Sequence, residues 1–114
     1  MKASVTVKEN YEFRRIYRKG KSAVTPSVVV YCQKNRKENS RLGITVSTKL
    51  GHAVVRNRVR RQLREIYRLN YGRLKPGYDI ILVARVRAVH QSYRKIEQAY
   101  LMALQELDLL ETVQ

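Results

Sequence analysis

One segment, residues 53–69, limits how this chain can fold more than any other. Its sequence, AVVRNRVRRQLREIYRL, repeats apolar residues with the period of an α-helix, and these residues share one face. They are Val55, Val59, Leu63 and Ile66. The remaining faces carry arginines, with Glu65 as the one acid among them. Because only one face can enter a core, the helix is predicted to pack against a layer of other elements.

The rest of the chain alternates between helical and strand periods. Further helices are predicted at residues 8–19 and 90–111. Asn10 is the predicted N-cap of the first of these helices, and Gly20 is its predicted C-terminal stop. Strands are predicted at residues 27–33, 41–47 and 78–85. The order of helix, two or three strands, helix, strand and helix indicates an α+β fold, an α/β sandwich with helices packed on a small mixed sheet.

The length of 114 residues predicts a single domain, residues 1–114. The helix at 53–69 connects the second predicted strand to the last one, which makes a β-α-β crossover. The general rule for such crossovers predicts that this one is right-handed.

The net charge of +15 exceeds what solubility usually requires and indicates a polyanionic partner. Nucleic acid is the first candidate, and an anionic membrane surface is the second. No stretch approaches the roughly 20 apolar residues of a membrane span, and the N-terminus lacks the apolar core of a signal peptide. Cys32, the one cysteine, is interpreted as a small apolar strand residue, and a free thiol fits a reducing cytoplasm.

The arginines of segment 53–69 are predicted to bind phosphate groups. Glu65 cannot pair with all of them, and like charges four residues apart destabilise a helix, so a solvated face with internal ion pairs does not explain them. A guanidinium offers a planar fork of donors that matches phosphate. The candidate nucleic-acid-binding residues of this helix are Arg56, Asn57, Arg58, Arg60, Arg61, Arg64 and Arg68. Phosphate contacts carry little sequence readout, so RNA and DNA are both open on this feature.

Three aromatic residues, Phe13, Tyr17 and Tyr31, are candidates for stacking on unpaired bases beside basic groups. Phe13 is equally a candidate core residue. His52 and His90 are isolated, and the sequence contains no legible metal-ligand cluster, P-loop or Ser/His/Asp arrangement. The residues therefore predict a binder of polyanions with no catalytic residues and no metal or cofactor of its own.

The segment SRLGITVSTKLGHAVVRNRVRRQLREIYR resembles the signature of the bacterial ribonuclease P protein family. In that family a strand rich in Gly, Ser and Val precedes a K-x-G-N-A-V-x-R-N-R-x-K-R segment. The upstream NYEFRRIYRKG, the strands VVVYC and DIILVAR, and the C-terminal helix also occur in the family's order, so the resemblance covers nearly the whole chain. The chain departs from the pattern at His52, where the family often has Asn, and at Thr48, where a second Lys is common. These departures leave the phosphate contacts of that loop open.

The resemblance implies an RNA-binding subunit of ribonuclease P, an endoribonuclease whose catalytic RNA removes the 5′ leader from precursor tRNA. The implied partners are the catalytic RNA and the leader of precursor tRNA in the cytoplasm, with no DNA or membrane. Magnesium would be required by the RNA and not bound by the protein. The positions that match the family's RNA-binding residues are Lys49, Arg56, Asn57, Arg58, Arg60, Arg61 and Arg64. The positions that match the family's leader-binding cleft are Phe13, Tyr17 and Tyr31.

The fold that the resemblance implies is a four-stranded mixed sheet with three helices in the order α-β-β-β-α-β-α. It is the ribosomal protein S5 domain 2-like fold, and its β-α-β crossover is left-handed, against the general rule. Two other function classes stay open from the residues alone. A ribosomal or general RNA-binding protein would bind unrelated structured RNAs equally well, and a DNA-binding regulator would need a symmetric dimer and a duplex site.

Overall fold

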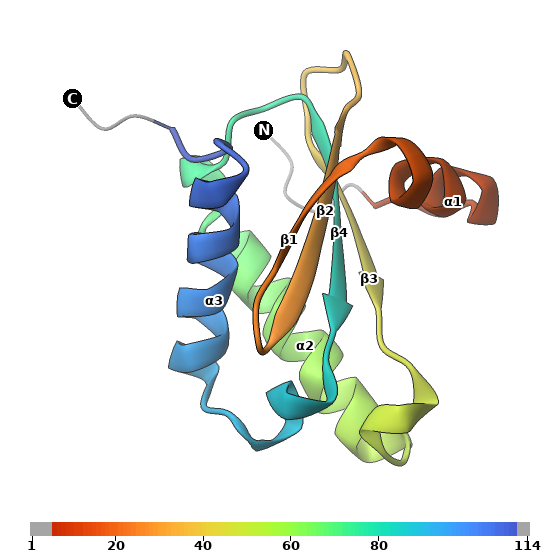
Figure 1. Ribbon diagram of the computed structural model, residues 1–114, viewed down its shortest axis with the longest axis vertical. Helices are drawn as coiled ribbons and strands as arrows, with labels where there is room; N and C mark the ends of the chain where they lie inside the picture. Colours follow the sequence, from red (N-terminus) through yellow and green to blue (C-terminus); the bar gives the residue numbers. More distant parts are fainter. Residues whose placement is uncertain (1–5, 112–114) are drawn as a thin grey trace.

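The computed structural model describes residues 6–111, and in that range the chain forms three α-helices and four strands (Figure 1). The helices are α1 (Asn10–Lys19), α2 (Ala53–Leu69) and α3 (Tyr93–Glu106). The strands are β1 (Lys21–Val24), β2 (Val28–Lys34), β3 (Arg41–Thr45) and β4 (Tyr78–Ala84). They form one sheet of order β1-β2-β4-β3, in which β3 and β4 run parallel and the other neighbours run antiparallel. The predicted α+β class and the predicted order of elements are confirmed.

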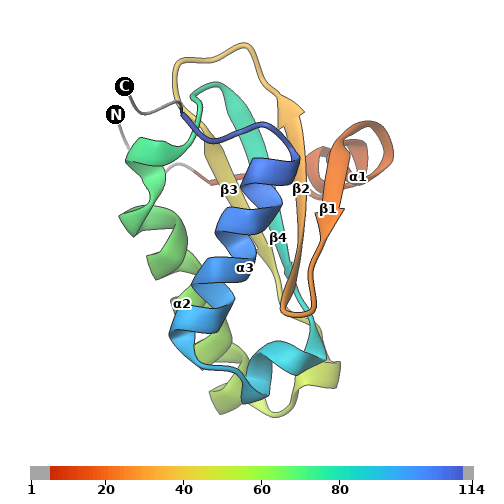
Figure 2. The same cartoon turned by 60° about the vertical axis from the view of Figure 1, so that its left-hand side comes forward.

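The two faces of the sheet are covered unequally (Figure 2). Helices α2 and α3 lie on one face, where Leu63 and Ile80 belong to the main core. Helix α1 lies over one end of the other face, where Ile16 and Ile81 form a smaller apolar cluster. In β2, alternate residues from Val28 onward are buried toward the main core, while those between them are only half-buried on the side of α1. The face under α1 therefore stays partly open to solvent.

The start of α1 differs from the sequence prediction. Glu9, rather than Asn10, is the N-cap, because Glu9 and Glu12 form a reciprocal capping box in which each side chain accepts a backbone N–H. Gly20 ends the helix as predicted. A Cβ at Gly20 would lie 2.5 Å from the carbonyl oxygen of Cys32, so a glycine is needed for the chain to turn closely against β2.

The bounds of α2 agree with the predicted range of 53–69, but α3 is shorter than the predicted range of 90–111. A short 3₁₀-helix at Val86–His90 precedes α3, which begins after Ser92. The Ser92 hydroxyl caps the new helix by accepting the N–H of Lys95 at 3.2 Å. At the other end Asp108 adopts a positive φ of 59°, which ends the helical path.

The β3–α2–β4 crossover is left-handed, as Figures 1 and 2 show together, so the general right-handed rule gives the wrong hand here. The reason lies in the layer arrangement. A right-handed path between the same two strands would carry α2 over the face that α1 occupies. The left-handed path instead puts α2 beside α3, where both helices bury their apolar faces in one core.

Candidate nucleic-acid interface

Helix α2 presents its arginines because its apolar face is fully used by the core. Val59, Leu63 and Ile66 are completely buried, which confirms the predicted stripe, while Val55 at the helix start is half-buried. Tyr67 is also completely buried, although it is not part of the predicted apolar stripe. The side chains at the other positions of α2 therefore stay outside the core.

The predicted nucleic-acid-binding residues lie around the rest of α2. Those exposed to solvent are Asn57, Arg58, Arg61, Arg64 and Arg68. Arg56 and Arg60 are half-buried at the margin of the core. The structure thus brings the whole predicted set onto the surface of one helix.

The hydrogen bonds of these arginines leave much of their donor capacity unused. Those of Arg56 and Arg58 go to the carbonyl oxygens of Gly51 and Val89, both at 3.1 Å. Arg68 pairs with Glu65, and this hydrogen bond lowers the pKa of Glu65. Within residues 6–111, Arg61 and Arg64 have neither an ion-pair nor a hydrogen-bond partner. These two free guanidinium groups are the most available to an external anion.

Lys49 lies in a short 3₁₀-helix, Thr48–Leu50, immediately before α2, and its side chain is exposed. It lines a hollow of about 700 Å³ together with Arg85 and Arg87, which follow β4. These two arginines are not among the residues predicted from the sequence. Their position in the sequence RVR, directly after an apolar strand, could have indicated them, because parallel strands β3 and β4 end at the same edge of the sheet.

The three predicted aromatic residues come together on the open face of the sheet. The rings of Phe13 and Tyr17, both on α1, have centroids 6.3 Å apart. Tyr17 meets Tyr31 of β2 edge to face, with centroids 4.8 Å apart and ring planes at 75°. All three are half-buried against the cluster of Ile16 and Ile81, so they combine a packing role with an accessible surface.

Two adjoining hollows follow β3 between α1 and α2, with volumes of about 200 and 500 Å³. Phe13, Ile44 and Arg60 line both of them. Arg64 lines the smaller hollow and Tyr17 the larger one. We call the two hollows together the β3 groove. The structure thus joins the arginine helix and the aromatic residues, which the sequence analysis treated as separate features.

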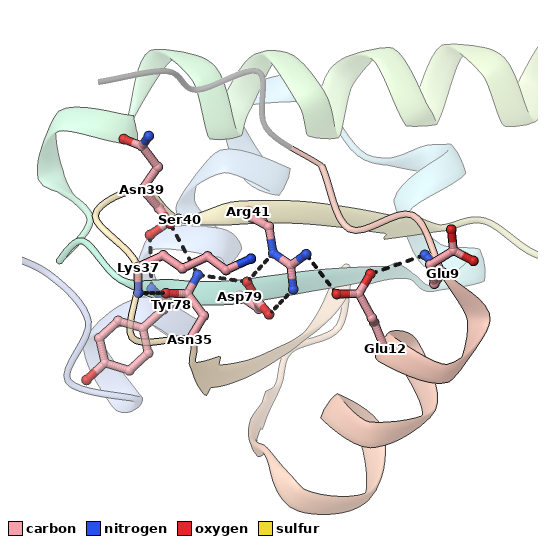
Figure 3. Close-up of polar contacts among 9 residues, drawn as sticks. All are labelled: Glu9, Glu12, Asn35, Lys37, Asn39, Ser40, Arg41, Tyr78 and Asp79. Carbon is pink, nitrogen blue, oxygen red and sulfur yellow. Dashed lines mark hydrogen bonds and ion pairs between the residues drawn. The ribbon is translucent and has the colours of Figure 1, made fainter.

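A buried ion-pair network fixes α1 to the sheet beyond the groove (Figure 3). Arg41 of β3 donates two hydrogen bonds to Asp79 of β4, at 2.9 and 2.7 Å, and pairs with Glu12 of α1 at 2.8 Å. Asn35 donates a further bond to Asp79 at 2.8 Å. Burial alone would raise the pKa of Asp79, but the bonds from Arg41 and Asn35 outweigh it and lower that pKa. The hydrogen bond from Arg41 also lowers the pKa of Glu12.

Comparison with known proteins identifies the family of the chain. The sequence model of the Ribonuclease P family matches residues 1–108 of the chain. The chain belongs to this family. It is therefore an RNA-binding protein subunit of bacterial ribonuclease P, and its partners are those of the family in general, the ribonuclease P RNA and precursor tRNA.

Relatives of the ribonuclease P family cover almost the whole chain. The ribonuclease P protein component of Alkaliphilus oremlandii is 43% identical over 112 residues, which are 98% of this chain and 98% of that protein. The solved RNase P protein of Staphylococcus aureus has a TM-score of 0.86 at 34% identity, and the match covers 95% of this chain and 99% of that protein. The solved RNase P protein of Thermotoga maritima has a TM-score of 0.79 at 32% identity, and the match covers 85% of this chain and 92% of that protein.

The two departures from the family's motif both lie in the short segment before α2. His52 occupies the N-cap of α2, and its side chain makes no capping hydrogen bond. Thr48 is exposed at the start of the 3₁₀-helix that carries Lys49.

In the described part of the chain, no cluster of three His, Cys, Asp or Glu side chains is suited to hold a metal ion. No helix among residues 6–111 is long and apolar enough to span a bilayer.

Proposed function

We propose that this subunit holds two RNAs on one continuous surface. The arginines of α2 contact the backbone of the ribonuclease P RNA, and the β3 groove receives the single-stranded 5′ leader of precursor tRNA. The observation that carries the proposal is that Arg60 lines the same hollows as Phe13, with Arg64 and Tyr17 beside them. A strand in the groove would therefore meet cations and aromatic rings together.

The chemistry of the groove favours a single strand over a duplex. Unpaired bases expose faces that stack on aromatic side chains, while arginines neutralise the adjacent phosphates. A duplex keeps its bases stacked on one another and would gain little from Phe13 and Tyr17. Because mature tRNA lacks the leader, such a groove would favour precursor tRNA over the mature product.

Arg61 and Arg64 support the contact with the larger RNA. Their guanidinium groups have no partner within residues 6–111, and α2 is anchored by a full row of core residues. A rigid helix with free guanidinium groups is suited to serial phosphate contacts. Lys49, Arg85 and Arg87 would extend this contact around the start of the helix.

In this proposal the hydrolysis itself belongs to the RNA partner and to magnesium ions that the RNA holds. The protein contributes binding and orientation, which lower the magnesium concentration that the complex needs. Substrate and partner RNAs are cytoplasmic, and we infer the same location for this chain.

The proposal is tested by reconstituting cleavage with the cognate ribonuclease P RNA over a range of magnesium concentrations. We expect the protein alone to cleave nothing and to stimulate cleavage of precursor tRNA most strongly at low magnesium. Equal cleavage with and without the protein at every magnesium concentration would contradict the proposal.

A competition experiment at fixed salt separates the other function classes. Precursor tRNA, mature tRNA, an unrelated structured RNA and duplex DNA compete for the protein assembled with its RNA. We expect precursor tRNA to compete best. Equal competition by the unrelated RNA would favour a general RNA-binding role, and strong competition by the duplex would favour a DNA-binding one.

A further inference from the structure

Every second residue of β3 points to the face shared with α1, and each of these residues contacts a different residue of that helix. Arg41 pairs with Glu12, Gly43 lies under Phe13, and Thr45 meets Tyr17. The sequence predicts a role for Phe13 and Tyr17 but none for their partners on β3. The strand thus forms a short row of contacts that sets the position of the aromatic helix.

The first two contacts fix the helix itself. The side chains of Arg41 and Glu12 are only 12% and 13% exposed, and Arg41 is held in turn by Asp79. A Cβ at Gly43 would come within 2.7 Å of the Phe13 ring, so the absence of a side chain lets that ring lie close against the strand. These contacts hold α1 independently of the Tyr17 side chain.

The third contact acts on the ring of Tyr17 alone. The Tyr17 hydroxyl and the Thr45 hydroxyl are hydrogen-bonded at 2.8 Å. On its other side the Tyr17 ring meets Tyr31 edge to face at 4.8 Å. These two contacts restrict the orientation of the ring, which is half-buried at the wall of the β3 groove.

We propose that Thr45 is a positioning residue, whose hydroxyl holds the Tyr17 ring in the orientation that stacks on a leader base. The proposal rests on the leader-binding role of the β3 groove. It also defines how Tyr17 recognises the leader. In this orientation the ring offers its face to the leader, and because every base has a π-face, this contact accepts any base.

The test measures how strongly the reconstituted complex prefers precursor tRNA over mature tRNA, as the ratio of the two affinities. Thr45→Val keeps the shape of the side chain and removes its hydroxyl, while Thr45→Ser keeps the hydroxyl. The worth of one hydrogen bond predicts a loss of preference of about 2- to 10-fold for Thr45→Val. Thr45→Ser should stay within about 2-fold of the parent protein.

Tyr17→Phe removes the other half of the same hydrogen bond and keeps the ring. We expect it to lose as much preference as Thr45→Val, and the double variant to lose no more than either single one. Affinity for mature tRNA and the thermal midpoint should change little in all of them. An equal loss for both tRNAs, or no rescue by serine, would show a merely structural role and overturn the proposal.

Tyr17→Ala separates this proposal from the function on which it rests. If Tyr17→Ala loses the preference while Thr45→Val and Tyr17→Phe keep it, the groove binds the leader but Thr45 does not position the ring. If Tyr17→Ala also keeps the preference, the leader-binding role of the groove is wrong.

Discussion

At the scale of single residues, the buried carboxylate of Asp79 shows how strongly the site depends on one ion-pair network. Its side chain is 2% exposed and accepts hydrogen bonds from Arg41 and Asn35. Removing one partner of a buried pair leaves an uncompensated charge, which costs far more than the pair contributes net. The network therefore acts as an anchor for α1 that tolerates little change.

Asp79→Asn should lower the free energy of unfolding at pH 7 by about 3 kcal/mol. The difference from the parent protein should shrink in acid. The pKa of Asp79 is lowered in the folded protein, so its contribution is complete above the unfolded pKa of about 3.9 and is lost as pH falls below that value. Denaturant titrations between pH 7 and pH 3 measure the effect. A difference that stays constant over this range would contradict it.

Gly43→Ala tests the close packing of Phe13. The new Cβ would meet the Phe13 ring at 2.7 Å and push it away from the strand, which overpacking predicts to cost about 1–3 kcal/mol of stability. Gly72→Ala is the matched control, because a Cβ at this position would meet no atom within 4 Å beyond the adjacent residues of the chain. Denaturant unfolding of both variants measures the difference, and equal stability would show that Phe13 yields without cost.

At the scale of elements, α2 is held by packing rather than by its own local sequence. Its apolar face is buried, but its free faces carry like charges that repel, and its N-cap His52 provides no capping hydrogen bond. The helix thus begins without one of the interactions that commonly stabilise a first turn.

His52→Asn should restore a cap and raise the free energy of unfolding by about 1 kcal/mol, which corresponds to about 4 °C in Tm. His52→Ala serves as the control, since alanine cannot accept the backbone N–H groups of the first turn. Thermal unfolding in low-salt buffer measures both. An Asn variant no more stable than the Ala variant would mean that the loop before α2 prevents capping.

At the scale of the whole molecule, the charges are divided unequally among the helices. The chain from residue 96 to residue 111 contains no Lys or Arg and four acids, Glu97, Glu106, Asp108 and Glu111. This stretch covers most of α3, which lies on the opposite side of the sheet from α1 (Figure 1). We expect residues 96–111 to face away from the RNA, because acids repel phosphates.

The division predicts which charges contribute to the salt dependence of binding. Arg61→Gln and Arg64→Gln should each weaken binding to the ribonuclease P RNA and reduce the slope of log K against log salt concentration by about 1. Lys75→Gln removes a cation that pairs with Asp108 at 3.3 Å, and it should leave the slope unchanged. Titrations at four salt concentrations measure the slopes. Equal slopes for Arg61→Gln and Lys75→Gln would mean that RNA binding depends on the total charge of the protein and not on the position of each cation.

Local periodicity in the sequence was sufficient to locate α2 and its buried stripe, the apolar strand β4 and the arginines left outside the core. These features depend on residues within a few positions of one another, so the pattern records them directly. The same pattern does not reveal the short strand β1, because β1 is mostly exposed and carries no clear alternation. The end of α3 was misplaced because a positive φ at Asp108 follows from local geometry that hydrophobic period does not describe.

The sequence by itself determined that a basic helix would present arginines to a polyanion, since its one apolar face had to be buried. Only the tertiary structure decided that Arg60 lines the same hollows as Phe13, that Arg41 joins Glu12 to Asp79, and that Thr45 bonds to Tyr17. These partners are separated by roughly 30 or more positions, and they meet only when α1 and α2 pack against the two sides of β3. The tertiary structure also decided the left hand of the crossover, because only this path lets α2 share a core with α3.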